Sequence, residues 1–152
     1  MAFDLKAFER IDVKRRTEEV PVPELVELFG EDKPVFIVQN LDAPEIMKVE
    51  VSAQSNDRMI ELVKGLFSKV EKEKINAIQE LAGIPADLDP SYIKCLTRIE
   101  LGLVTPKLDR QAIIKIGKAS NEVFYRINQK IKDLSGKGAE LGKLQASTKI
   151  KK

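Results

Sequence analysis

The sequence predicts a mostly α-helical protein of the α+β class. We expect a helical bundle-like domain with a small β-hairpin-like element near its N-terminus and a flexible C-terminal tail. Three observations lead to this prediction. Apolar residues recur at helical spacing from Asp42 onward. Two short runs rich in β-branched residues precede that point, at about residues 15–22 and 35–40. Beyond residue 136, large apolar residues are too few to offset the entropy of ordering the chain.

Length and composition indicate one globular domain. The chain has 152 residues, of which 43% are hydrophobic and 33% are charged. A chain of this size buries roughly 68–70% of the surface that its unfolded form exposes, which is enough for a core. We therefore assign residues 1–136 to a single helical domain that includes the β element. Residues 137–152, with five lysines against Glu140 alone, form the flexible basic tail.

The first 40 residues predict short elements. Apolar residues between 3 and 8 allow one or two helical turns. Pro21 and Pro23 disfavour helix and favour an extended segment over 17–22. Residues 24–30 form either a short helix or a second extended piece, and 35–39 form a strand. Because the connection is short, we expect the two strands to pair antiparallel. A lone pair is marginally stable in water, so it must pack on helices.

Two helical segments are expected between Asp42 and Gly83. Asp42 and Glu45 have the spacing of a capping box and start a helix without a clear end signal. A further segment presents one apolar face, and its period continues to a stop at Gly83. The residues of that face are Met59, Ile60, Val63, Leu66, Phe67 and Val70.

Three more helices are expected after residue 88. Asp89 caps a helix that is stopped near Pro106, and Asp109 caps a short one. Ser120 caps the last helix, which Gly136 is expected to end. The predicted inward residues are Tyr92, Leu96, Ile99 and Leu103 in the first of these helices, and Val123, Phe124, Ile127, Ile131 and Leu134 in the last.

Composition excludes much catalytic chemistry. The chain has no histidine and a single cysteine, Cys95, which rules out His-dependent triads, imidazole metal sites and multi-cysteine zinc sites within it. No apolar run is long enough to span a membrane, and the N-terminus does not resemble a secretory signal. We predict no catalytic, cofactor-binding or metal-ligating residue, and expect a non-enzymatic cytoplasmic protein.

Two segments, residues 25–29 and the lysine-rich tail, are candidates for contact with a partner. The residues Leu25, Val26, Leu28 and Phe29 are either core or a partner surface, because the sequence alone does not separate these readings. The segment 136–143 resembles a phosphate-binding loop, but it lacks the required glycine spacing and hydroxyl residue. The lysine tail is the basis of an alternative, a nucleic-acid-binding module. Since it has no arginine or aromatic residue, a partner-contacting extension is favoured.

The overall pattern resembles the tail assembly chaperones of long-tailed (siphovirus-type) phages and prophages. The likeness spans about residues 3–143 and is strongest in the closing segment. The residues that carry it are 16–25 (RTEEVPVPEL), 33–38 (KPVFIV), 106–109 (PKLD) and 124–143, which includes FYRINQKI and LSGKGAELGK.

The resemblance implies a morphogenesis factor that is absent from the mature virion. Such chaperones bind the tape measure protein, keep it soluble and deliver it for polymerisation of the major tail tube protein. A homo-oligomer is plausible, and no membrane or nucleic-acid partner is implied. Many family members also make a longer product by programmed frameshifting at a slippery codon pair that can encode Gly-Lys. Gly142 and Lys143 are the preferred position here, with Gly136 and Lys137 as the alternative.

The frameshift hypothesis predicts a feature of the gene. The codons of Gly142 and Lys143 should lie in a slippery heptamer that is followed by an overlapping reading frame. Nucleotide sequencing of this region checks the expectation. If neither Gly-Lys codon pair lies in such a context, the hypothesis fails.

Overall fold

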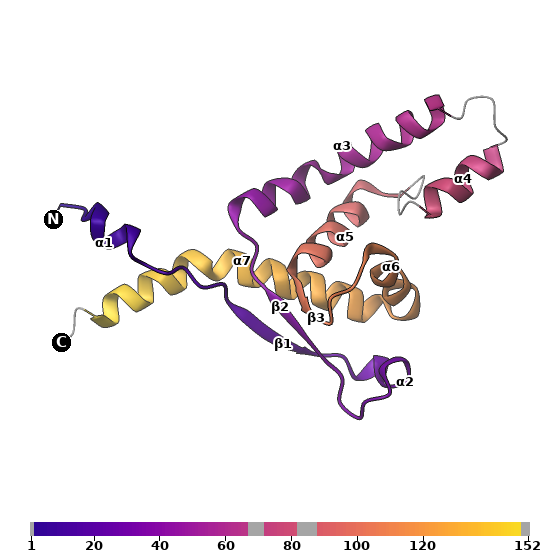
Figure 1. The fold of residues 1–152 in the computed structure, drawn as a ribbon. Coiled ribbons are helices and arrows are strands. Elements are labelled where there is room, and N and C mark those ends of the chain that lie inside the picture. Colours follow the sequence, from indigo (N-terminus) through magenta and orange to yellow (C-terminus); the bar gives the residue numbers. More distant parts are fainter. Residues whose placement is uncertain (1, 67–71, 82–87, 150–152) are drawn as a thin grey trace.

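The computed structural model describes residues 2–66, 72–81 and 88–149, and within them all side chains except those of 79, 80 and 137–149. Helices pack against a small antiparallel sheet, as Figure 1 shows, and the predicted mostly α, α+β class is confirmed. In chain order the elements are α1 (Leu5–Glu9), β1 (Thr17–Pro21), the 3₁₀ helix η1 (Pro23–Leu25), α2 (Val26–Phe29), β2 (Val35–Gln39), α3 (Ala43–Leu66), α4 (Lys72–Leu81), α5 (Pro90–Gly102), β3 (Leu103–Thr105), α6 (Arg110–Ala119) and α7 (Asn121–Lys149).

The sheet has the order β1-β2-β3. Strands β1 and β2 pair antiparallel, with Thr17 opposite Gln39 and Pro21 opposite Val35, so the predicted pairing is confirmed. The third strand was not predicted, because we expected the helix from residue 90 to continue to near Pro106. Instead α5 ends at Gly102, and β3 pairs antiparallel with β2. The residue before a proline is driven towards extended backbone, which favours a strand at Thr105.

Helix α3 is one element of 24 residues, whereas we expected two separate helices in this region. Its start is the predicted capping box: the Glu45 amide donates to Asp42 Oδ1 at 2.9 Å, and the Asp42 amide donates to Glu45 Oε2 at 3.0 Å. The intervening residues contain no glycine or proline before Gly65, so nothing in the sequence interrupts the helix. The predicted stop at Gly83, together with Phe67 and Val70, lies outside the described residues.

The remaining caps agree with the sequence. Asp89 Oδ1 accepts from the Ser91 amide at 2.7 Å, and Asp109 Oδ1 accepts from the Ala112 amide at 2.8 Å. Ser120 Oγ accepts from the Val123 amide at 3.3 Å, where α7 begins. Each cap satisfies an amide that has no partner inside its helix.

One face of the sheet packs on α5 and α7 to form the core. The five residues predicted to face inward from α7 are all buried, which confirms that prediction, as are three of the four in α5 and β3. Tyr92, the fourth, is half-buried and stacks on the Phe124 ring at 5.3 Å. The core comprises Val20, Val22, Leu25, Phe36, Val38, Leu41, Val49, Leu96, Ile99, Leu103, Ile113, Ile116, Val123, Phe124, Ile127, Ile131 and Leu134.

The expected helix end at Gly136 is wrong. Helix α7 continues to Lys149 and so includes most of the segment that we expected to be a flexible tail. An interior glycine costs a helix only about 1 kcal/mol relative to alanine. Beyond it, Gly138 and Gly142 add similar costs, whereas Lys137, Ala139 and Leu141 are among the residues that favour helix.

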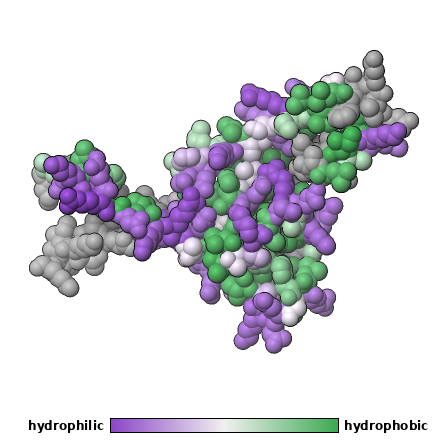
Figure 2. Space-filling model, viewed as in Figure 1, coloured by the Kyte–Doolittle hydropathy of each residue, from purple (hydrophilic) through white to green (hydrophobic). Residues whose placement is uncertain are grey.

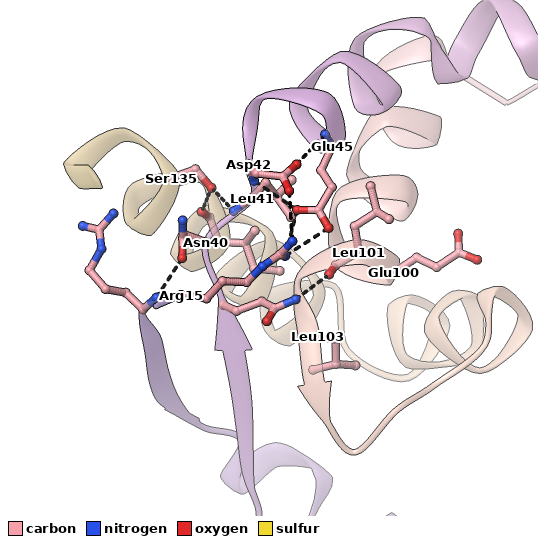
Figure 3. Close-up of polar contacts among 12 residues, drawn as sticks. Arg15, Asn40, Leu41, Asp42, Glu45, Glu100, Leu101, Leu103 and Ser135 are labelled. Atoms are coloured by element: carbon pink, nitrogen blue, oxygen red, sulfur yellow. Dashed lines mark hydrogen bonds and ion pairs between the residues drawn. The ribbon is translucent and has the colours of Figure 1, made fainter. Parts of the chain in front are cut away.

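A cluster of polar contacts holds the corner between β2 and α3 (Figure 3). The Leu41 amide donates to Ser135 Oγ of α7 at 2.9 Å, and Ser135 Oγ donates to the Ile131 carbonyl at 2.7 Å. Gln39 Nε2 donates to the Leu101 carbonyl near the end of α5 at 3.3 Å. Asn40 Oδ1 accepts from the amide of residue 16 at 2.8 Å. The corner therefore connects β1, β2, α3, α5 and α7.

Alanine substitutions at Gly102 and Gly136 should have opposite effects on the free energy of unfolding. A Cβ at Gly102 would lie 2.7 Å from Cδ1 and Cγ2 of the fully buried Ile131, whereas a Cβ at Gly136 would meet nothing within 4 Å. Gly102→Ala should lower the free energy of unfolding by about 1–3 kcal/mol through overpacking. Gly136→Ala should raise it by roughly 0.5–1 kcal/mol, because the residue lies inside a helix.

Chemical denaturation followed by far-UV circular dichroism measures both effects, and each variant serves as the other's control. A destabilising Gly136→Ala would instead support the helix end that the sequence predicts at that position.

Candidate partner-binding surface

Helix α3 has two apolar faces. The first, with Val49, Ala53 and Val63, is buried. The second consists of Val51, Met59, Leu62 and Leu66, which recur at i, i+8, i+11 and i+15 and so share one side of the helix. All four of these residues are exposed, Leu66 by 70%. We call these four residues the outer face of α3.

The outer face lies on α3, which projects away from the sheet (Figure 1). In Figure 1, α3 extends past the end of α5, and α4 lies beside its far half. Figure 2 shows hydrophobic side chains gathered at this end. Leu81 at the end of α4 adds another exposed apolar side chain. A contiguous exposed apolar surface of this kind is typical of a site that binds another macromolecule.

An open groove runs along the outer face. Its volume is about 750 Å³, and α3, α4, α5 and the start of α6 contribute to it. The lining residues are Lys48, Val51, Ser52, Ser55, Asn56, Met59, Leu81, Thr97, Glu100, Asp109, Arg110 and Gln111. Apolar side chains from α3 and α4 face polar ones from α5 and α6, so the groove suits an amphipathic ligand.

The polar wall of the groove is held by paired groups. Arg110 donates from Nε and Nη2 to Glu100 Oε2 at 3.1 and 2.9 Å, and from Nη2 to Thr97 Oγ1 at 3.0 Å. The Asp109 carboxylate caps α6. Asn56 is only 7% exposed, and its side chain makes no hydrogen bond within the described part of the chain. Its amide borders the groove, where a ligand could form a hydrogen bond with it.

The residues predicted as a partner surface divide between core and surface. Leu25 is 1% exposed and belongs to the core, so it is excluded from any surface contact. It packs inward because η1 turns the chain directly after β1. Val26 is half-buried, and Leu28 and Phe29 are exposed on α2. The Phe29 ring also contacts Phe36 edge-on at 5.4 Å, which leaves Leu28 as the most accessible of the four.

A bidentate ion pair attaches η1 and α2 to the core. Arg126 of α7 donates to the two carboxylate oxygens of Glu24 at 3.0 and 2.6 Å, and also to Glu122 and to the Pro21 carbonyl. Hydrogen bonding from Arg126 holds the pKa of Glu24 below its ordinary value, against a small opposing effect of burial. The pair fixes Glu24, four residues before Leu28, to α7.

Sequence reasoning missed the outer face because it placed Met59 and Leu66 on one inward stripe with Ile60 and Val63. In the structure, Ile60 and Val63 face the body, while Met59 and Leu66 face solvent. A signal was present: apolar residues at 51, 59, 62 and 66 follow a second helical stripe beside the one formed by Val49, Ala53 and Val63. Two such stripes exceed what one buried helix face requires.

Among the described residues, few side chains are suited to bind a metal ion or to act as a nucleophile. Within 2–66, 72–81 and 88–149, no group of three or more acidic or cysteine side chains could hold a metal ion. Cys95 is a half-buried free thiol packed against the core. Burial raises the pKa of Tyr92, in keeping with its packing role.

None of the described helices is long and apolar enough to cross a membrane. The proposed frameshift pair, Gly142 and Lys143, lies within α7, in its part without described side chains.

Comparisons with known proteins give no relative for this chain. It matches no family model, no curated protein and no solved structure. The surface must therefore be interpreted from its own geometry.

The Glu24–Arg126 pair predicts a pH dependence of stability. Because the pKa of Glu24 is lowered on folding, its contribution is present above the ordinary value of 4.5 and is lost as the pH falls through the folded-state value. Wild-type protein should lose stability below about pH 4.5, and Glu24→Gln should make this loss smaller. Thermal unfolding between pH 3 and 7 measures it.

Glu27→Gln is the matched control, because Glu27 is exposed on the adjoining α2 and makes none of these contacts. A control variant that alters the acid dependence as much as Glu24→Gln would contradict the assignment to this ion pair.

Proposed function

We propose that this protein is a phage tail assembly chaperone that binds the tape measure protein in the host cytoplasm. It keeps that long client soluble and releases it when the major tail tube protein polymerises. The resemblance over residues 3–143 supports the family assignment, and the outer face of α3 with its groove supports a binding role. The observation that carries the proposal is this exposed apolar face beside a groove of about 750 Å³.

The groove fits a helix better than a small molecule. It is open along α3, and Val51 and Met59 provide apolar contact on one wall while Arg110 and Glu100 provide charge on the other. An amphipathic client helix would place its apolar stripe on α3 and its polar residues towards α5 and α6. Tape measure proteins are long helical chains whose apolar stripe is exposed before the tube closes around them.

Release of the client requires that each contact contribute only a modest binding free energy. The apolar side chains of the outer face are already partly buried, so a single site would gain only part of the free energy of full burial. Many copies along one client would supply avidity without making any one contact slow to dissociate. Polymerising tube protein could then displace the copies one after another.

Co-expression tests the proposal. Wild-type protein should raise the soluble yield of the neighbouring tape measure protein and co-purify with it. Changing Met59→Ser and Leu62→Ser together should weaken binding to a soluble helical fragment of that client by about tenfold or more, because each lost apolar contact contributes roughly 1 kcal/mol. Isothermal titration calorimetry measures the affinity.

Tyr125→Ser is the matched control, since Tyr125 and Leu62 are equally exposed, at 54%. It should leave client affinity unchanged. Leu28→Ser tests the surface on α2, and a loss of binding confined to that variant would move the site there. Unchanged client solubility together with no co-purification would contradict the proposed function.

A further inference from the structure

The N-terminal segment, residues 2–13, is an arm whose side chains are all exposed. Helix α1 has no buried residue, although Asp4 Oδ1 caps it by accepting from the Ala7 amide at 3.1 Å. The large apolar side chains of the arm are 54–80% exposed: Phe3, Leu5, Phe8, Ile11 and Val13. A helix of five residues is unstable in water by itself. Such a segment requires an apolar surface to remain ordered.

The arm is attached firmly at one point. Arg15 donates to Asp42 Oδ2 at 3.0 Å and to the Glu45 carboxylate at 2.9 and 3.0 Å. The amide of residue 16 donates to Asn40 Oδ1, and the Asn40 amide donates to the carbonyl of residue 16. Figure 1 shows that α1 leaves this corner on the side of the molecule opposite α4 and α6. The arm therefore points away from the groove of its own chain.

We propose that the arm of one copy docks in the α3 groove of a second copy. The chain then carries both halves of an interface on opposite sides, an arm with exposed apolar side chains and a groove with one apolar wall that includes Val51 and Met59. This inference uses the groove assigned to the client above, but it does not depend on the identity of the client.

The available area suits a small, reversible contact. An aromatic side chain buries roughly 150 Å² or more, so the two Phe and three aliphatic side chains of the arm offer several hundred Å². One partner's share of a standard protein interface is about 800 Å². Charge presents no obstacle, because the arm carries both signs (Asp4, Lys6, Glu9 and Arg10) and so does the groove (Lys48, Glu100, Asp109 and Arg110).

The geometry implies head-to-tail assembly. An arm that enters the groove of the next copy leaves its own groove open for a third copy, so the interface is heterologous and generates rings or open chains. Assembly of this kind would compete with a client helix for the same groove. Free chaperone would associate with itself, and client would replace the arm.

Sedimentation velocity on the full chain without client tests the inference. Wild-type mass should rise above the 17.1 kDa monomer with concentration. A chain lacking residues 2–13 should stay monomeric, and so should full-length Met59→Glu, whose groove is blocked. Neither change removes a buried residue, and circular dichroism checks that both variants fold.

A mixture of the two variants gives the sharpest result. The truncated chain keeps a groove and the Met59→Glu chain keeps an arm, so together they should form a one-to-one complex that grows no further. Wild-type protein that stays monomeric overturns the inference, as does truncated protein that assembles like wild type. Because client is absent from these measurements, their failure leaves the proposed function standing, and failure of client binding leaves this inference standing.

Discussion

The hydrogen bond from the Leu41 amide to Ser135 Oγ is the contact on which the arrangement of the molecule most depends. It joins the corner after β2 to a helix 94 residues later in the chain. Asn40 and Asp42, on either side of Leu41, hold the start of β1 and the start of α3. The direction in which α3 leaves the sheet and the point from which the N-terminal arm departs are therefore set by the same few residues (Figure 3).

Helix α3 is much longer than the helix that packs against it. Helix α3 has 24 residues, whereas α5, its main packing partner, has 13. At about 1.5 Å per residue, α3 extends well beyond the surface that α5 can cover. The buried residues of α3 lie on one side of the helix from Val49 to Val63, and the outer face on another side stays accessible. The surface thus results from the architecture and does not mark a defect in packing.

Local signals in the sequence predicted most of the fold. Caps at Asp42, Asp89 and Asp109, the β1–β2 pair and the inward stripe of α7 were all predicted, since each depends on residues close together in the chain. Strand β3 was missed because three residues are too short to show a period, and only pairing with β2 makes them a strand. The outer face was missed for a related reason. Periodicity identifies apolar stripes, but tertiary packing decides which stripe is covered.

The close approach of α5 to α7 at Gly102 has a consequence for sequence change. No side chain fits at position 102 while Ile131 keeps its present shape, because its branches fill the space beside the Gly102 Cα. A larger residue at one position becomes tolerable only when the other loses a branch. In homologous chains with the same fold, these two positions should therefore covary, with glycine opposite isoleucine or alanine opposite a smaller partner.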